Sequence, residues 1–525
     1  MPRDISRLSL PDMRKAPQRR LLTSLGVLAL TYIGLIVTAC SGNGPATSTP
    51  QNTAPAVPLS VVEVASIVQN AALSVDVPVV VAVTDRTGAI LAVFETPGAP
   101  ATSTGNFGVA VDSHELAVSL ARTAALFSND QAPLSSRTVR FISGIHFPPG
   151  ISFAPNADLY GIENTNRGCP LNATFNAGKT INPSRSIDGA SFGLGVATGK
   201  ADALDSDPTA VNPGGVPLFK GGHAVGGIGV VSNSASVSEF AAFSGASLSG
   251  FLPTSAQLPP PGVVIIGGIS LPFVNQTVIP AGVSAGTVSG TYLVGPVAGA
   301  LPPEGDLVGP NAGTGGLTQS DVASVVNQAV ATADLTRAVI RLPSGSRTHM
   351  TIAVTDLDGT VLALHRMPDA TVFSIDVAVA KARNVIYFSG AGSSDLPGIP
   401  SNTAITNRTI GFAAQPLFPP GIDGSNHGPF FELYSQDLSN PCAQGSQPSN
   451  PNQNGIVFFP GSLPLYKNGV LVGGLGVSGD GVDQDDYVTN AGAQGFEAPA
   501  NIRADQVTID TVRLPYLKFP RNPTN

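Results

Sequence analysis

Three consecutive residues in the second half of the chain, His365, Arg366 and Met367, combine side chains that can bind a metal centre. Histidine and methionine are common axial ligands of haem iron, and an arginine can hold a propionate through a charge-assisted hydrogen bond. The three residues follow an apolar stretch with strand character, where the chain turns toward the next helix. The alternative is structural: Met367 packs, Arg366 pairs with Asp369 or Asp376, and His365 points to solvent.

The stretch GDGVDQDDY, residues 479–487, concentrates carboxylates. They belong to Asp480, Asp483, Asp485 and Asp486. Several oxygens in a flexible loop are what Ca²⁺ prefers, so a metal site is one interpretation. The stretch lacks the spacing and the terminal glutamate of an EF-hand. The other interpretation is that these aspartates cap a helix that begins near Gln484.

Lys381, on the helix predicted after the first motif, has two interpretations as well. It contacts a ligand carboxylate, or it is an ordinary solvated or ion-paired helix lysine. The remaining histidines are scattered and show neither HxxxH nor HxH spacing, so they predict no histidine metal cluster. They are His114, His146, His223, His349 and His427.

No set of residues predicts catalysis. The chain has no nucleophile elbow, phosphate loop, CxxC motif or triad. The glycine-rich runs GGHAVGGIG at Gly221 and GVLVGGLG at Gly469 begin hairpins and do not join a strand to a helix. Glycine there predicts close approach of a helix or partner to a sheet.

The composition sets broad limits. At 525 residues the chain is long enough for two or three domains, and 42% hydrophobic residues can build a core. The 59 Gly and 46 Pro residues, with only 12% charged residues, favour turns and sheet over helical bundles. The net charge of −8 and the absence of a basic run beyond residue 20 argue against nucleic acid.

Residues 1–40 have the pattern of an export signal. Basic residues precede an apolar run that ends in VTAC, so Cys40 is predicted to be lipidated and to become the N-terminus of an exported, membrane-tethered lipoprotein. In a Gram-negative host, Ser41 after the cysteine favours the outer membrane. The alternative is a transmembrane anchor over 21–39. Residues 41–58 predict a flexible tether.

The body of the chain contains an internal duplication. VASIVQNAA at Val64 matches VASVVNQAV at Val322, and VAVTDRTGAILAVF at Val81 matches IAVTDLDGTVLALH at Ile352. Three further blocks match in the same order: 136–151 with 407–422, 213–230 with 460–477, and 269–274 with 512–517. We predict a first domain over 59–276, a Gly/Pro-rich linker over 277–316, and a second domain over 317–525.

Each copy predicts an α+β fold. A helix leads into a hairpin whose turn, DRTG or DLDG, suits a type I turn. A second helix follows, with Ser113 or Ser374 as the expected cap, and then a long loop and a second hairpin that turns at Gly221-Gly222 or Asn468-Gly469. Consecutive hairpins with flanking helices predict an antiparallel sheet with helices on at least one face.

The second copy resembles the GlcG/HbpS-like family, also called the haem-degrading domain family. Its matching segments are Asp356, Gly359, 366–370, Lys381-Ala382, 473–479 and Asp485/Asp486. The first copy keeps Asp85, Gly88, 213–215 and 226–229. It has Phe94-Glu95-Thr96 in place of Arg-Met and is expected to have Ala121-Arg122 in place of Lys-Ala.

The resemblance implies two tandem profilin/PAS-like domains, oligomeric assembly and, in some members, binding of haem or a related tetrapyrrole. Where relatives pair as separate chains, we expect this chain to carry both partners, as an intramolecular pseudo-dimer. The second copy would then supply the polar contacts to a small ligand, from His365, Arg366, Met367 and Lys381. A structural or interaction lipoprotein with vestigial pockets is the alternative, and an enzyme acting on haem or small oxidised metabolites is a third.

Apart from Cys40, each copy holds one cysteine. Cys169 and Cys442 follow the matched Ile151 and Ile422 by 18 and 20 residues. An exported protein with cysteines in equivalent loops can join them in a disulfide. The alternatives are two buried free thiols or cysteines of a haem pocket.

Overall fold

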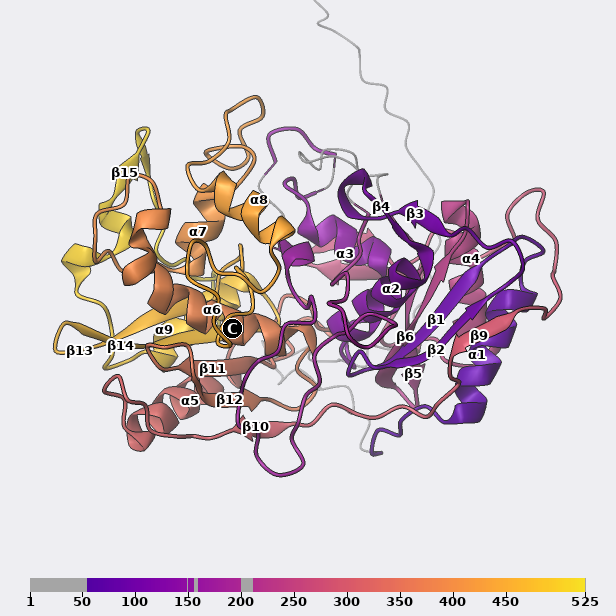
Figure 1. Cartoon of the computed structure of the whole chain (residues 1–525), viewed down its shortest axis with the longest axis horizontal. Coiled ribbons are helices and arrows are strands. Elements are labelled where there is room, and N and C mark those ends of the chain that lie inside the picture. The colour runs from indigo at the N-terminus through magenta and orange to yellow at the C-terminus, as the bar shows by residue number, and fades with distance from the viewer. Residues whose placement is uncertain (1–53, 149, 155–158, 200–210, 525) are drawn as a thin grey trace, which may run out of the picture. The chain divides into compact units, whose positions relative to one another are not determined.

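The computed structural model describes residues 54–148, 150–154, 159–199 and 211–524 (Figure 1). The predicted signal, Cys40 and nearly all of the tether lie outside these residues. Within the described ranges, no helix has both the length and the apolar character needed to cross a bilayer.

The first copy contains two helix–hairpin units and a C-terminal hairpin (Figure 1). Its elements are α1 (Val61–Leu73), β1 (Val80–Asp85), β2 (Ile90–Glu95), β3 (Thr102–Thr104), η1 (Asn106–Gly108), β4 (Ala110–Asp112), α2 (Ser113–Phe127), α3 (Ser136–Ser143), η2 (Ile162–Asn164), β5 (Gly215–Lys220), β6 (His223–Val231), α4 (Ala235–Leu248), β7 (Val263–Ile266) and β8 (Ile269–Pro272).

The second copy repeats the order of the main helices and strands without β3 and β4, and it adds α8 and three short 3-10 helices. Its elements are α5 (Gln319–Ala333), β11 (Thr351–Thr355), β12 (Val361–Arg366), α6 (Phe373–Phe388), η3 (Ala391–Asp395), α7 (Asn407–Ala413), α8 (Phe431–Ser439), β13 (Ser462–Lys467), β14 (Val470–Ser478), α9 (Val482–Gly492), η4 (Ala500–Ile502), η5 (Ala504–Gln506), β15 (Thr508–Ile509) and β16 (Val512–Arg513).

Each copy is built on a five-stranded antiparallel sheet, which confirms the predicted α+β class. The strand orders are β5-β6-β1-β2-β9 and β10-β12-β11-β14-β13. The two orders correspond strand for strand, as the duplication requires. In the first copy α2 packs on the sheet at β6, and α1 pairs with α4; in the second copy α6 packs at β14, and α5 pairs with α9.

The first hairpins turn as their sequences predict. The Gly88 and Gly359 amides donate to the Asp85 and Asp356 carbonyls at 3.1 and 3.0 Å. Both glycines have φ above 80°, a conformation that L side chains rarely adopt. Asn468 also has positive φ, 53°, before Gly469, as a type I′ turn needs.

Glycines in the second hairpins bring a helix against the sheet. A Cβ on Gly229 would collide with the Ala117 carbonyl oxygen of α2, and one on Gly476 with the Ala378 carbonyl of α6. The predicted reason for these glycines, close approach of a helix, is therefore confirmed.

The segment 277–316 is more than a connection. It supplies β9 (Thr291–Val294), which pairs with β2, and β10 (Gly305–Val308), which pairs with β12. It also satisfies the aspartates of both turns, because Ala300 N donates to Asp85 and Thr314 N to Asp356. One stretch of chain thus completes an edge of each sheet.

Two expected helix caps are wrong by one or two residues. The cap of α2 is Asp112, whose carboxylate accepts from the His114 and Glu115 amides; Ser113 is already inside the helix. The cap position of α6 is Val372, without a side-chain bond. The Ser374 hydroxyl is engaged elsewhere, with Thr371 and Ser478 at 2.8 and 3.0 Å.

Candidate functional site

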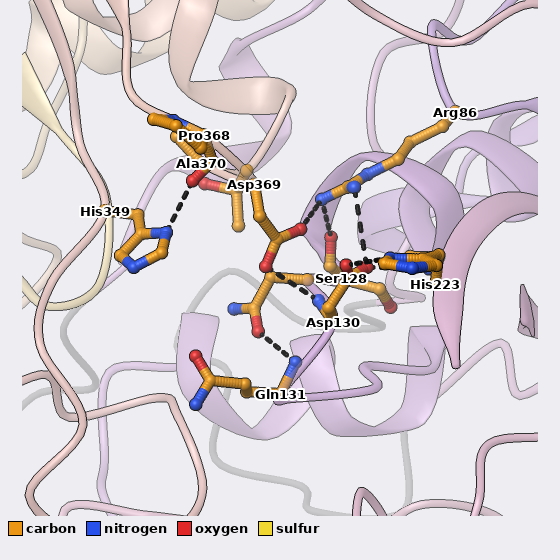
Figure 2. Close-up of polar contacts among 12 residues, drawn as sticks. Arg86, Ser128, Asp130, Gln131, His223, His349, Pro368, Asp369 and Ala370 are labelled. Atoms are coloured by element: carbon orange, nitrogen blue, oxygen red, sulfur yellow. Dashed lines mark hydrogen bonds and ion pairs between the residues drawn. The ribbon is translucent and has the colours of Figure 1, made fainter. Parts of the chain in front are cut away.

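A buried group of charged residues joins the two copies, and we call it the interface charge cluster (Figure 2). Its members are Arg86, Asp130, His223, Arg341, Asp369 and Asp480. Asp369 lies at its centre: Arg86 donates to Oδ1 at 2.6 Å, Arg341 to Oδ2 at 2.8 Å, and the Asp130 amide to Oδ2 at 3.0 Å. The first and third of these donors come from the first copy.

Local structure explains the position of Asp369. It follows β12 in the turn MPDA and has a φ of 55°, which aspartate tolerates better than most residues. Gly98 occupies the equivalent position of TPGA in the first copy, with a φ of 82°. The turn is therefore shared by the copies, but only the second copy carries a carboxylate on it.

Two arginines stabilise the charge of the buried Asp369 carboxylate. Burial would raise the pKa of Asp369, but the charges of Arg86 and Arg341 outweigh it and hold the pKa below its usual value. Arg341 also pairs with Asp480 at 2.5 Å, where both side chains are fully buried. Burying these charges is compensated by the ion pairs they form with one another.

The cluster ends at a histidine of the first copy. His223 Nδ1 lies 2.5 Å from Asp130 Oδ2, and Figure 2 shows the ring beside that carboxylate. Burial lowers the pKa of His223, but the hydrogen bond and charge of Asp130 raise it above the usual value. Burial, together with the charge of Asp369, raises the pKa of Asp130.

The structure separates the predicted His-Arg-Met set. His365 Nδ1 lies 2.7 Å from Asp306 Oδ1 of β10, and its side chain is 20% exposed. Arg366 is fully buried and donates to the carbonyls of Ala370 and Pro303, and burial lowers its pKa to about 10. Met367 is buried, and its sulfur accepts from the Met350 amide at 3.3 Å.

Arg366 and Met367 both contact the protein's own backbone. The side chains of both residues hold the turn that carries Asp369, and neither reaches a ligand pocket. Arg366 pairs with Glu304 at 3.4 Å and not with Asp369 or Asp376. Of the three residues, only His365 keeps a side chain that an outside group can reach.

Lys381 lies on α6 and is completely buried. Its Nζ donates to the Val477 carbonyl at 2.8 Å and to Asp485 Oδ2 at 3.0 Å, and stands 4.9 Å from the centre of the Phe459 ring. Burial lowers the pKa of Lys381, and the charge of Asp485 opposes that change. The ion-paired interpretation of Lys381 describes this geometry.

Among the described residues, Asp485 is the one acidic residue lining an apolar pocket between the copies. Phe373 and Phe459 line the pocket from the second copy, and Ile142 and Phe147 from the first. Burial raises the pKa of Asp485 to about 7 although Lys381 opposes it, and its Oδ1 has no hydrogen-bond partner. The cavity volume is about 30 Å³, because the protein's own side chains fill it.

The other aspartates of 479–487 do not form the metal site considered from the sequence. Asp483 and Asp486 both pair with Arg408, and Asp480 pairs with Arg341. Among the described residues, no three His, Cys, Asp or Glu side chains come together to hold a metal ion. Their carboxylates are neutralised by arginines, so the metal interpretation is wrong for this geometry.

The structure also corrects the alignment of the Lys-Ala motif. Cβ atoms at Gly227 and Gly474 would collide with the carbonyl oxygens of Ala121 and Ala382 respectively, so these two alanines are equivalent. Lys381-Ala382 therefore corresponds to Leu120-Ala121, one residue earlier than expected. Arg122 and Arg383 then match, and each donates to the glycine carbonyl of its own hairpin turn, Gly88 and Gly359.

Cys169 and Cys442 are joined in a disulfide, with their Cα atoms 5.5 Å apart and a sequence separation of 273. Near it, burial raises the pKa of Asp437 to about 7, while Asn164 of the first copy donates to its carboxylate at 2.9 Å.

Sequence reasoning missed Arg86, Asp130, Arg341 and Asp437 as interface residues. A weak signal existed for one member of the cluster, because Asp369 occurs where the first copy has glycine.

Three comparisons connect the chain with known proteins. Residues 317–494 match the family model described as haem degrading protein HbpS-like. The corrinoid adenosyltransferases PduO of Salmonella typhimurium and Citrobacter freundii are each 26% identical, over 151 and 172 residues. The matches cover 29% and 33% of this chain, and the chain spans only 33% and 38% of the length of those curated relatives.

Solved structures were compared as well. The crystal structure of a PduOC:heme complex matches with a TM-score of 0.22 and 21% identity, over 34% of this chain and 94% of that one. A double mutant of HbpS from Streptomyces reticuli gives 0.21 and 21%, over 37% and 97%. On the family match and the motifs of the second copy, residues 317–494 form a domain of the GlcG/HbpS-like family.

Proposed function

We propose that the protein is an exported small-ligand-binding protein whose second copy binds haem or a related tetrapyrrole, with His365 as the iron ligand. The observation that carries this proposal is the 2.7 Å contact between His365 Nδ1 and Asp306 Oδ1. A carboxylate that accepts the Nδ1 proton fixes the imidazole and leaves the Nε2 lone pair available, as in many metal-binding histidines. The family description supports the tetrapyrrole class.

The residues fit this group only in part. His365 offers a partly exposed nitrogen, which suits a single axial ligand. Met367 and Arg366 are buried and hydrogen-bonded, so they fit neither as a second axial ligand nor as a propionate contact. The apolar pocket at Asp485 does not fit haem: its 30 Å³ is far below the roughly 300–1,000 Å³ of ligand pockets. Histidine, methionine, cysteine and tyrosine are absent from its described lining.

A haemin titration followed by Soret absorbance tests the proposal. We expect saturable binding at micromolar haemin, lost in His365→Ala. His427→Ala is the matched control, because His427 lies against the Phe431 ring at 4.1 Å and away from β12. Unsaturating uptake, or equal binding by the wild type and His365→Ala, would overturn the proposed site.

A structural role is the second candidate. It is favoured by the pocket between the copies, which the protein's own side chains fill, and by the charges of the interface charge cluster, which pair with one another. Under this hypothesis the copies act as an intramolecular pair and bind no cofactor. A protein that stays colourless with haemin and keeps its full stability without it would support this role.

We also propose that the protein is exported and lipidated at Cys40. A disulfide between the copies suits an oxidising compartment outside the cytoplasm, and it supports this proposal independently of the N-terminal pattern. A Cys40→Ala variant should lose the lipid mass from its N-terminus and leave the membrane fraction.

A further inference from the structure

The two copies contain pockets at equivalent positions, between the helix that packs on the sheet and the last long helix. The equivalence follows from conserved geometry. Arg137 pairs with Glu239 in the first copy as Arg408 pairs with Asp486 in the second. The residue before each acid, Ser238 or Asp485, lines its own pocket.

The first-copy pocket is far larger than its counterpart. Its cavity volume is about 310 Å³, against about 30 Å³ in the second copy. The larger value falls in the range of small-molecule sites. Strand β3 forms one wall, and the floor includes Leu116 and Leu120 of α2.

Three replacements contribute to the difference in size, and side chains of the first copy such as Phe147 and Leu159 also line the smaller pocket. Leu120 takes the place of Lys381, Ser238 that of Asp485, and Asn212 that of Phe459. Each removes a charge or a ring that fills space in the second copy. The Asn212 side-chain amide instead donates to the carbonyl of Thr104 in β3 at 3.1 Å, so it holds β3 beside the pocket.

The lining of this pocket is polar and uncharged. Among the described residues around it there is no Asp, Glu, Lys, Arg or His. Hydroxyl groups of Thr102, Thr104 and Ser232 and the amide of Asn233 surround an aliphatic floor. An uncharged lining cannot compensate an ionised ligand for lost water, whereas hydroxyls and amides replace water around a neutral polar one.

We propose that the first copy holds a second binding site, in the pocket walled by β3, α2 and the start of α4, for a neutral hydroxyl-bearing ring of sugar size. The ring's hydroxyls meet the Ser, Thr and Asn side chains, and its C–H face lies on Leu116 and Leu120. This site is independent of the haem proposal, because it contains no residue of the second copy.

Saturation-transfer NMR with glucose, galactose and N-acetylglucosamine tests the site, with gluconate and glucosamine as charged counterparts. We expect at least one neutral sugar to bind saturably and at least tenfold more tightly than the charged counterparts. Two variants should weaken it at least tenfold. One is Leu120→Lys with Ser238→Asp, which installs the pair of the second copy; the other is Asn233→Tyr at the exposed rim.

Ser236→Tyr is the control, because Ser236 lies in the first turn of α4, three residues after Asn233, but does not line the pocket. The Asn233→Tyr variant keeps the test decisive if the buried double substitution prevents folding. The proposal is overturned if no neutral sugar saturates, if a charged counterpart binds as tightly, or if Asn233→Tyr binds like Ser236→Tyr. A failed haemin titration leaves it untouched.

Discussion

The guanidinium of Arg86 and the carboxylate of Asp369 lie 2.6 Å apart, although 283 residues separate them in sequence. The pair occurs once and not twice. Leu357 stands where the repeat would place a second arginine, and Gly98 where it would place a second aspartate. A contact that two identical copies would make twice is therefore made once in this chain.

Removing one partner of this pair should destabilise the protein strongly. Asp369→Asn leaves Arg86 and Arg341 buried without their shared counter-charge, so we expect the free energy of unfolding to fall by about 3–5 kcal/mol. Denaturant unfolding measures it. Arg513→Ala, which breaks an exposed pair with Asp505, is the control and should cost at most about 1 kcal/mol. Equal losses in the two variants would contradict a docking role for Asp369.

The Lys381–Asp485 pair should be replaceable by the residues of the first copy. Lys381→Leu alone leaves Asp485 buried without its cation, and we expect a loss of about 3–5 kcal/mol. Adding Asp485→Ser, the residue present at position 238, should recover most of that loss. Unfolding of the two variants and the wild type measures the recovery. A double variant no more stable than Lys381→Leu would mean that the pair has a role beyond neutralisation.

Stability should fall as pH rises through the acidic range, because burial raises the pKa values of both Asp437 and Asp485 to about 7. Burial raises the pKa of Asp437 to about 7 in the folded protein, while an unfolded aspartate has a pKa near 3.9. Between those values the folded state holds a proton that the unfolded state has lost, so the stability contribution declines from about pH 4 to 7. Its slope is up to roughly 1.4 kcal/mol per pH unit.

Asp437→Asn should flatten that part of the curve. The free energies of unfolding of the variant and the wild type, measured from pH 4 to 8, should be closest at the acid end and diverge as pH rises, because only the wild type loses the stability that the protonated Asp437 supplies. Asp188→Asn is the control, because the Asp188 carboxylate is exposed to solvent and its pKa lies below the usual value. A wild-type slope that survives in Asp437→Asn would assign the effect to another group.

Loss of the disulfide should weaken the link between the copies. The bond closes a loop across 273 residues, and a native disulfide typically contributes about 2–5 kcal/mol. Cys169→Ser, Cys442→Ser and the double variant should therefore unfold at the same, lower denaturant concentration. A double variant more stable than either single one would show that a free thiol, and not the missing bond, causes the loss.

Much of the fold could be predicted because its signals are local. The glycine turns and the Asn-Gly hairpin depend on residues adjacent in sequence, and the duplication is visible as matching sequence blocks. The structure has these turns, and the strand orders of its two sheets correspond. The caps at Ser113 and Ser374 were misplaced because a neighbouring Asp112 competes for the first, and Thr371 and Ser478 bind the second hydroxyl.

The candidate site was harder to predict, because its partners are distant in sequence. No residue close to Asp369 in sequence indicates that Arg86 will pair with it. Likewise, no residue close to Lys381 indicates its partner, because Asp485 is 104 positions further along the chain although its carboxylate lies 3.0 Å from Nζ. The motif His365-Arg366-Met367 reads as one ligand set in sequence, yet strand alternation and the following turn send its side chains to three different environments.

The linker strands β9 and β10 have a consequence for solubility. An uncovered sheet edge presents free amides and carbonyls to which a strand of another molecule can add. Here a single stretch of chain covers such an edge in each half, on β2 and on β12. A protein that lacks residues 277–316 would therefore expose the edges of β2 and β12. With the linker in place, these edges are formed by the four-residue strands β9 and β10, and short edge strands are poor templates for edge-to-edge aggregation.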